Sequence, residues 1–230
     1  MPIQVTHTYD LYQFDELSDR AKEAAREWYR QASCHDEWWD SVYEDAIRMA
    51  EILGIEVDYR YHDGRQGRPG WKEPKIWFSG FSCQGDGACW EGRYRYAAGA
   101  LKKLQDEAPA FYKDEAGVKQ PIPGNVELHR IAKALQDVQG RYFYKLEARS
   151  THRGHYNHSG CMSIEVEHTE DRYRDLGDAE DEVKEALRDF ADWIYRRLEE
   201  EYDWLNSDEQ VDESIRCNEY TFDEDGNRAD

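Results

Sequence analysis

The chain has 230 residues, which is long enough for one large domain or two small ones with a buried core. Its 50 acidic and 30 basic residues give a net charge of −20, which excludes an electrostatic affinity for nucleic acids or anionic membranes. Eight Trp, sixteen Tyr and seven Phe residues exclude a disordered acidic chain, because such chains lack large apolar side chains. We therefore expect a folded protein whose partners are basic.

The first quarter of the chain predicts a strand followed by two helices. Residues 3–12 alternate β-branched, aromatic and polar side chains, which is typical of a strand. A helix is expected to begin at Asp15 or Ser18, and a second one to run from near Asp36 to Gly54. The apolar face of the first helix comprises Leu17, Ala21, Ala24, Ala25 and Trp28.

The next segments predict a small sheet. Residues 55–61, 74–81 and 88–96 have strand patterns, and their connections are short and rich in turn residues. Together they predict an antiparallel meander. A short helix over residues 97–107 and a surface loop over residues 109–124 are expected to follow, the loop because it contains three prolines and two glycines.

The second half predicts a helix, a hairpin and one long helix. The helix begins at a cap formed by Asn125 and ends at Gly140, and residues 142–151 and 156–168 form the two arms of the hairpin. The long helix spans residues 178–205 and carries its acids opposite an apolar stripe. The stripe comprises Val183, Leu187, Phe190, Ile194, Leu198, Tyr202 and Leu205.

These elements predict an α+β fold in which an antiparallel sheet, a meander plus a hairpin, packs against several helices. We expect one domain over residues 1–230, because the strands need neighbours from both halves of the chain. No apolar run approaches eighteen residues, and the first residues lack the pattern of a signal peptide. Five widely spaced cysteines are typical of reduced thiols, so we expect a cytoplasmic protein.

The acidic residues are concentrated in the C-terminal region. Residues 170–230 contain 23 acidic and 8 basic residues, a charge of −15. Neighbouring like charges cost stability, which a chain tolerates more readily when a partner uses them, although an acidic face also serves simply to keep a helix soluble. The residues expected to bind a basic groove are Glu185, Asp189, Asp192, Glu199, Glu200, Asp203, Asp208, Glu209, Asp212 and Glu213.

The glycine-rich segment over residues 78–92 has the most unusual local composition in the sequence. It holds four glycines between two aromatic strand ends, which indicates unusual backbone dihedrals or a close approach. One interpretation is a phosphate-cradling or catalytic loop, and the alternative is a structured hairpin, since the spacing fits no nucleotide-binding motif. The candidate loop residues are Gly80, Gly85, Asp86, Gly87 and Glu91.

The tip of the predicted hairpin collects imidazoles and a thiol, which are ordinary zinc ligands. His152, His155, His158, Cys161 and His168 fall within seventeen residues. Alternating strand positions send some of them to opposite faces, and no zinc-binding spacing rule is met. We therefore predict a polar hairpin tip, with no metal site, no cofactor and no assigned catalytic residue.

The segments 14–22, 78–88 and 218–226 add a resemblance that spans most of the chain. They read FDELSDRAK, FSGFSCQGDGA and NEYTFDEDG, and the glycine-rich segment is the most specific of the three. In these segments the chain resembles a family of uncharacterised proteins of bacteriophages and prophages, some of which are labelled antitoxins. The resemblance implies a phage or prophage origin and an accessory role inside a bacterial cell.

Three functions follow as hypotheses. The first is a phage-encoded acidic protein that binds the basic groove of a host defence protein by nucleic-acid mimicry, in an anti-CRISPR or anti-restriction role. The second is an antitoxin that neutralises a basic toxin. The third is a small metal-dependent enzyme that uses the glycine-rich segment. A binding protein is favoured over an enzyme, and the oligomeric state is left open.

Overall fold

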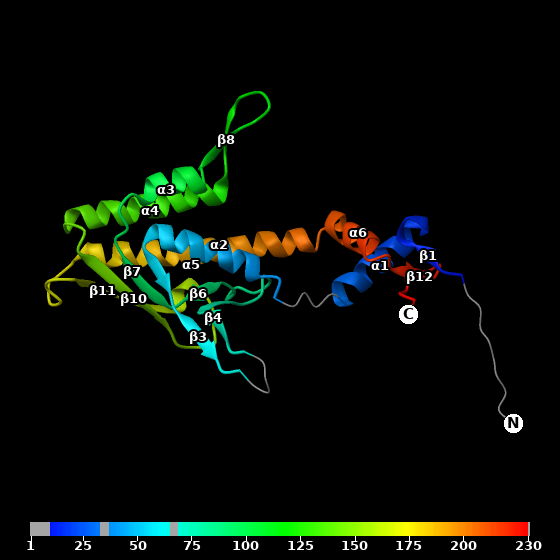
Figure 1. Ribbon diagram of the computed structural model, residues 1–230, viewed down its shortest axis with the longest axis horizontal. Helices are drawn as coiled ribbons and strands as arrows, with labels where there is room; N and C mark the ends of the chain where they lie inside the picture. The colour runs from blue at the N-terminus through cyan, green and yellow to red at the C-terminus, as the bar shows by residue number, and fades with distance from the viewer. Residues whose placement is uncertain (1–9, 33–36, 65–68, 230) are drawn as a thin grey trace. The chain divides into compact units, whose positions relative to one another are not determined.

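The computed structural model shows two compact units (Figure 1). The residues that it describes are 10–32, 37–64 and 69–229. Unit 1 comprises Met1–Trp38 and Glu200–Asp230, and unit 2 comprises Trp39–Glu199. Helices and antiparallel strand pairs occur together, so the α+β class is confirmed. That residues 1–230 fold cooperatively as one domain stays a prediction.

Unit 2 is built on a four-stranded antiparallel sheet. Its strands, in spatial order, are β11 (Met162–His168), β10 (Leu146–His152), β7 (Gly92–Arg95) and β2 (Ile55–Val57). Tyr94 lies opposite both Ile55 and Ala148 in the register, and all three side chains are buried. The alternate residues on these strands are charged, so one face of the sheet meets the core and the other carries Arg and Glu.

Four helical segments of unit 2 contribute buried residues to its core. They are α2 (Asp40–Leu53), α3 (Ala100–Glu107), α4 (Pro123–Arg141) and the unit 2 part of α5 (Asp178–Leu205). Trp90 anchors α5, because its indole nitrogen donates to the carbonyl of Leu187 at 3.4 Å and its ring contacts Phe190. The predicted bounds of the long helix are confirmed, and α2 ends at the left-handed Gly54 as expected.

The three strands of the predicted meander are interrupted and are joined by hydrogen bonds that the sequence does not indicate. Each of its three strands is interrupted at one residue, Asp58, Lys75 or Glu91. The backbone groups at these residues form a closed ring of hydrogen bonds, of 2.9 Å from Asp58 to Glu91, 3.0 Å from Glu91 to Lys75 and 2.8 Å from Lys75 to Asp58. The ring satisfies three amides and three carbonyls that the interruptions would otherwise leave unpaired.

The ring lets every predicted strand pair with both of the others. β3 (Tyr59–His62) pairs with β4 (Trp71–Pro74), and β5 (Ile76–Phe78) pairs with β6 (Ala88–Trp90), as a meander requires. The first strand also pairs with the third, through β2 and β7. The antiparallel meander predicted for residues 55–96 is therefore confirmed, and the pairing of β2 with β7 adds a contact between its first and third strands.

Three expectations for unit 2 are corrected. The loop expected over residues 109–124 contains a hairpin of β8 (Phe111–Lys113) and β9 (Lys119–Pro121), whose turn is closed by the Asp114 carboxylate. Asn125 does not cap α4, which begins two residues earlier, and its side chain instead donates to the carbonyl of Pro109. The hairpin of β10 and β11 turns over residues 153–161, which include the 3₁₀ turn η2 (Ser159–Cys161).

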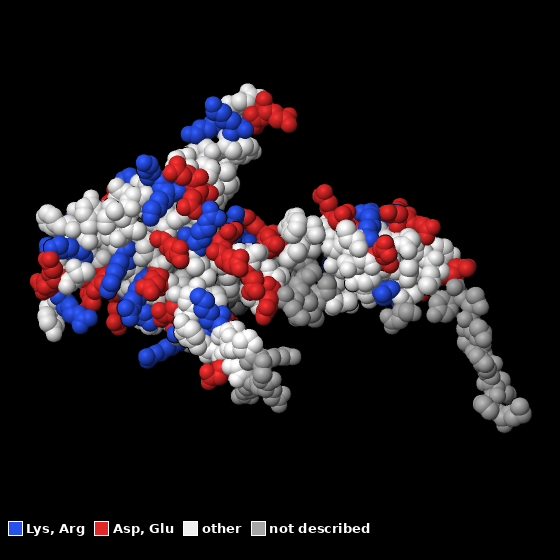
Figure 2. All heavy atoms as spheres, in the orientation of Figure 1, with Lys and Arg blue, Asp and Glu red and all other residues white. Residues whose placement is uncertain are grey.

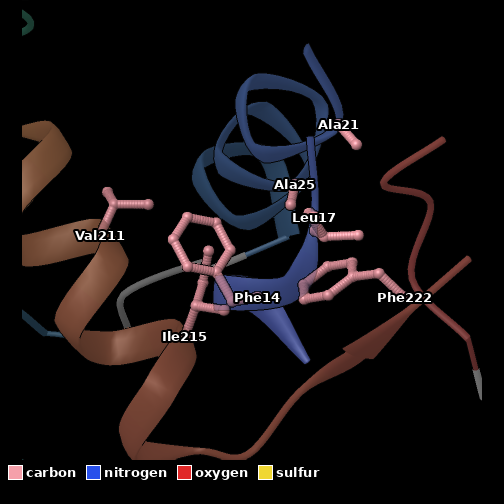
Figure 3. Packing of buried hydrophobic residues seen from close by; sticks show 7 residues of the cluster. All are labelled: Phe14, Leu17, Ala21, Ala25, Val211, Ile215 and Phe222. Carbon is pink, nitrogen blue, oxygen red and sulfur yellow. The ribbon is translucent and has the colours of Figure 1, made fainter. Parts of the chain in front are cut away.

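Unit 1 brings the two ends of the chain together. Its elements are β1 (Tyr12–Gln13), η1 (Phe14–Glu16), α1 (Asp19–Ala32), the end of α5, α6 (Asp208–Cys217) and β12 (Thr221–Phe222). β1 pairs with β12, and α1 packs against α6. Figure 3 shows the small core between them: Phe14, Leu17, Ala21, Ala25, Val211, Ile215 and Phe222.

Several local expectations for unit 1 are also corrected. Of the strand predicted over residues 3–12, residues 3–9 lie outside the described residues; residues 10 and 11 are not in a strand, and residue 12 begins β1. Asp36, the expected start of α2, also lies outside them. Ala24 is exposed, because α1 buries only a narrow face against α6. Tyr202 is 41% exposed, so the buried stripe of α5 ends at Leu198, where the helix leaves unit 2.

We predict that Gly92→Ala destabilises the protein. A Cβ atom at this position would lie 2.2 Å from the carbonyl oxygen of Glu56 on the neighbouring strand, so the sheet would have to shift. The free energy of unfolding in urea should fall by roughly 1–3 kcal/mol.

Gly140→Ala is the matched control, because its Cβ atom would have no neighbour closer than 4.0 Å. In helix α4 this change should raise the free energy of unfolding by about 0.5–1 kcal/mol. Equal stability of the two variants would contradict the close approach of β2 and β7.

Candidate partner-binding surface

The charge of the molecule is divided unequally between the two units. Unit 1 contains 20 acidic and 6 basic residues, a formal charge of −14, whereas unit 2 contains 30 and 24, a charge of −6. The sequence places the excess in residues 170–230. The structure adds the residues before position 39 to it, because they belong to the same unit.

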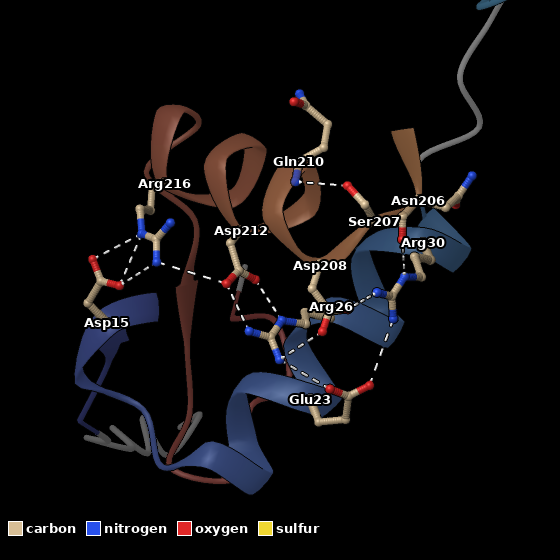
Figure 4. A network of polar contacts seen from close by, with 10 residues as sticks. All are labelled: Asp15, Glu23, Arg26, Arg30, Asn206, Ser207, Asp208, Gln210, Asp212 and Arg216. Carbon is tan, nitrogen blue, oxygen red and sulfur yellow. Dashed lines mark hydrogen bonds and ion pairs between the residues drawn. The ribbon is translucent and has the colours of Figure 1, made fainter. Parts of the chain in front are cut away.

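Arg26 lies at the centre of a polar network between α1 and α6 (Figure 4). Its guanidinium binds the carboxylate of Asp212 in a bidentate manner, with Nε–Oδ1 and Nη2–Oδ2 distances of 2.6 and 2.8 Å. The two side chains are 19% and 15% exposed, so water screens the pair only partly. The hydrogen bond from Arg26 to Asp212 is the main reason why the pKa of Arg26 is raised.

Two further arginines extend this network. Arg30 donates to Asp208 at 2.5 Å and to the carbonyl oxygen of Asn206 at 3.1 Å. Arg216 binds Asp15 at 2.9 Å, and this hydrogen bond lowers the pKa of Asp15 below its ordinary value. All three arginines thus join segments from opposite ends of the chain.

The basic side chains of unit 1 also cover aromatic rings. The cationic groups of Lys22, Arg26 and Arg216 lie 6.0, 5.8 and 5.4 Å from the ring centroid of Phe14, which is 2% exposed. Arg228 lies over the rings of Trp28 and Tyr220. Five of the six basic residues of unit 1 are therefore used in its internal contacts, and Arg20 is the sixth.

The internal use of these cations leaves an anionic exterior. Asp and Glu spheres predominate on the part of Figure 2 that corresponds to α1 and α6. Several exposed acids of unit 1 have no ion pair within the described part of the chain: Asp10, Asp19, Glu27, Asp203, Glu209, Glu213, Glu219, Glu224 and Asp225. This anionic exterior is the candidate partner-binding surface.

The ten residues predicted to bind a partner are divided between the units. In unit 2, Glu185, Asp189 and Asp192 line one hollow beside η2, together with Arg188. Asp189 is already paired with Arg130 at 2.9 Å, and Glu199 is half-buried farther along α5.

The other six predicted residues lie in unit 1. Asp208 and Asp212 hold Arg26 and Arg30, so their role is structural. Glu200, Asp203, Glu209 and Glu213 are exposed. Glu209 and Glu213 are four residues apart on α6 and thus lie on one helix face.

Sequence reasoning missed the contribution of the N-terminal residues to this surface. It did not pair Asp15, Arg26 and Arg30 with the C-terminal region, from which they are separated by more than 170 positions. One signal was available. Arg26 and Arg30 are four residues apart, as are Asp208 and Asp212. When two helices with these spacings pack together, each arginine can therefore face one of the aspartates.

The glycine-rich segment forms the loop between β5 and β6. The Asp86 carboxylate accepts hydrogen bonds from the backbone of Cys83 at 2.7 Å and of Ser82 at 2.9 Å, and these bonds lower its pKa. A Cβ atom at Gly87 would lie 2.5 Å from Cβ of His158, so this glycine permits a close approach of the hairpin tip. The carbonyl oxygen of Gly80 accepts a hydrogen bond from the hydroxyl of Tyr195.

These contacts favour the structured-hairpin interpretation of the loop. Two of its backbone amides already bind the loop's own Asp86, and Gly85 packs near the ring of Tyr156. The nearby histidines are also occupied, because Nε2 of His152 contacts the carbonyl oxygen of Tyr156 and Nε2 of His158 contacts Sγ of Cys161 at 3.2 Å. Over residues 10–32, 37–64 and 69–229, no three metal-ligating side chains gather.

Glu91 belongs to the strand junction and not to the loop. Its carboxylate binds Nζ of Lys75 at 2.7 Å and accepts a hydrogen bond from the backbone of His152 at 3.0 Å. Burial acts to raise the pKa of Glu91, but these two hydrogen bonds outweigh it and hold the pKa below the ordinary value. The charged form of Glu91 therefore helps to lock the junction.

We predict that Glu91→Gln is most damaging at neutral pH. A depressed pKa in the folded state contributes stability above the unfolded value of about 4.3, and this contribution is lost as the pH falls through the folded pKa. The loss in the free energy of unfolding, roughly 1–3 kcal/mol at pH 7, should shrink as the pH is lowered to about 3.

The control for this measurement is Glu165→Gln. Glu165 is exposed on the same sheet and has no ion pair within the described ranges. Urea unfolding at several pH values should show no pH-dependent difference for it. A constant difference for Glu91→Gln would show that the charge of Glu91 is not what stabilises the junction.

We also predict that Arg26→Met destabilises unit 1. The change leaves the half-buried Asp212 carboxylate without its bidentate partner, which should cost roughly 1–3 kcal/mol in the free energy of unfolding. Arg20→Met, an exposed site on the same helix, should change it by less than about 0.5 kcal/mol. Urea titrations of the two variants provide the measurement, and equal midpoints would contradict a stabilising role for the pair.

Comparison with known proteins gives one match. Residues 38–208 match a family described as a domain of unknown function, DUF8835, and this range contains all of unit 2 and reaches the first residue of α6. Searches of curated proteins and of solved structures give no match. None of the helices in the described residues is both long and apolar enough to span a membrane. Because the match covers most of its length, the chain belongs to the DUF8835 family.

Proposed function

We propose that the chain is a phage-encoded accessory protein that binds and inhibits a host defence protein, with the anionic exterior of unit 1 as its binding surface. The observation that carries the proposal is the charge of −14 in unit 1, where five of the six cations are engaged internally. An exterior of this kind is complementary to a groove that normally holds a nucleic-acid backbone. The protein would act in the cytoplasm of the bacterial host.

The packing of α6 on α1 supports a binding role for this surface. Asp212 turns inward to Arg26, and Asp208, although exposed, binds Arg30, so α6 is held against α1 with Glu209 and Glu213 exposed. A rigid array of like charges raises the association rate with a cationic groove, and the rate falls as salt screens the field. Both effects are expected for an inhibitor that competes with DNA or RNA.

The antitoxin hypothesis rests on the same surface, since a basic toxin also presents cations. Rescue of growth by co-expression with a neighbouring toxic gene would distinguish this function. The enzyme hypothesis rests on the glycine-rich segment, where Asp86 already binds two amides of its own loop. We therefore rank the enzyme last.

The test is a double charge reversal on α6, Glu209→Lys with Glu213→Lys. Bacteria that carry a restriction or CRISPR system would express the chain, and phage plating would be measured. The wild-type chain should increase plating, and the variant should lose this effect. The purified variant should associate with the defence protein at least about 10-fold more slowly than the wild-type chain at low salt.

The matched control is Glu44→Lys with Glu51→Lys on α2. Both residues are exposed in unit 2, and the net charge changes equally. This control should keep the inhibition, and both variants should keep their circular dichroism spectra, since exposed charges contribute only about 0–1 kcal/mol. Unchanged inhibition by the α6 variant would overturn the proposed surface, and a loss from Glu185→Lys instead would move it to α5.

A further inference from the structure

One arginine of unit 1 is held mainly by two aromatic rings. The guanidinium of Arg228 lies 4.7 Å from the ring centroid of Tyr220 and 5.7 Å from that of Trp28. It donates to the backbone carbonyls of Thr221 and Ala229. Within the described residues it binds no carboxylate, whereas Arg26, Arg30 and Arg216 each bind at least one.

The two rings that receive Arg228 are fixed by the core. Trp28 meets Tyr220 edge to face, with centroids 5.2 Å apart and an interplanar angle of 86°. Trp28 also packs at 5.7 Å against the fully buried Phe222. The rings are therefore oriented by contacts that do not depend on Arg228 itself.

The segment that carries Arg228 is a tight turn against α1. The Asp223 carboxylate accepts hydrogen bonds from the backbone of Asp225 and Asn227. A Cβ atom at Gly226 would lie 2.1 Å from the carbonyl oxygen of Ala21, and φ at this glycine is +87°. The turn thus places the Arg228 side chain against the two rings. Trp28, Tyr220 and Arg228 are each half-buried.

We propose that the Trp28–Tyr220 pair is a binding site for an arginine or lysine side chain of the basic partner, and that Arg228 is its internal occupant. This inference rests on the proposed function and specifies its point of contact. Aromatic faces attract a cation and discriminate little between an internal and an external one. A planar guanidinium stacks better than an ammonium, so a partner arginine is preferred over a lysine.

The surroundings support displacement. Glu219, Glu224 and Asp225 are exposed next to the site in the sequence, and they attract a second cation to the place where Arg228 sits. Within the described residues, Arg228 loses ring contacts and two carbonyl hydrogen bonds when it leaves, and water replaces the latter. While Arg228 fills the site, a cation of the partner cannot bind there. The apparent affinity for the partner is therefore lowered in proportion to the fraction of time that Arg228 occupies the site.

The experiment titrates the full chain with a hexa-arginine peptide in a calorimeter at low salt. Arg228→Ala should bind the peptide about 3-fold more tightly than Arg20→Ala, which changes the net charge equally at an exposed position of α1. Trp28→Leu or Tyr220→Leu should weaken binding by about 5-fold, because the ring contact is lost.

A second measurement uses the wild-type chain and therefore does not depend on whether the variants fold. In the wild-type chain, the amide of Ala229 donates to the carbonyl of Thr221, so peptide binding should raise hydrogen exchange at Ala229. Equal affinities for Arg228→Ala and Arg20→Ala, or unchanged exchange at Ala229, would overturn the inference and leave the acidic surface standing. No peptide binding by any variant would overturn the acidic surface as well.

Discussion

The bidentate ion pair between Arg26 and Asp212 is the contact on which the character of unit 1 depends. It joins residues that are 186 positions apart and lies over the small apolar core. A half-buried pair of this kind contributes little net stability, because desolvation offsets much of the Coulomb attraction. Its consequence is geometric: Arg26 and Arg30 of α1 are engaged with α6, and the acids left without partners are exposed to water.

Unit 2 relies on a different constraint. The ring of backbone hydrogen bonds at Asp58, Lys75 and Glu91 lets three short strands turn from hairpins into the main sheet. The side chains reinforce it, since Glu91 binds Lys75 and Asp58 binds Arg149. These residues lie within the range that defines the family, whereas α1 and all but the first residue of α6 lie outside it. Of the nine acids listed for the candidate surface, all but Asp203 thus lie outside the matched range.

Local patterns in the sequence predicted those elements whose structure depends on neighbouring residues. The bounds of α5 follow from its apolar period, and the end of α2 follows from Gly54. The interruptions at Asp58, Lys75 and Glu91 could not be predicted. These residue types are weak strand formers but do not by themselves interrupt a strand, and the cause is a contact between three segments. Ala24 and Tyr202 were assigned to buried faces for the same reason, since periodicity does not show where a helix leaves its core.

The candidate surface was half predicted. The acids of α6 are visible as a charge run, yet Asp208 and Asp212 look the same in sequence as Glu209 and Glu213. Only the packing of α1 against α6 separates the two carboxylates that bind arginines of α1 from the two that do not. A charge run therefore predicts that a surface exists, and the helix partner decides which residues form it.

Charge also links the folding of unit 1 to the binding of a partner. The repulsion among its outward acids destabilises the compact state, and salt screens this long-range term more than it screens the close pair of Arg26 and Asp212. A cationic partner relieves the same repulsion at a specific place. Whatever binds only the folded unit also stabilises it by mass action, so affinity and stability rise together. An acidic unit with a small core and internally used cations should therefore be most stable when a cationic partner of the proposed kind is bound.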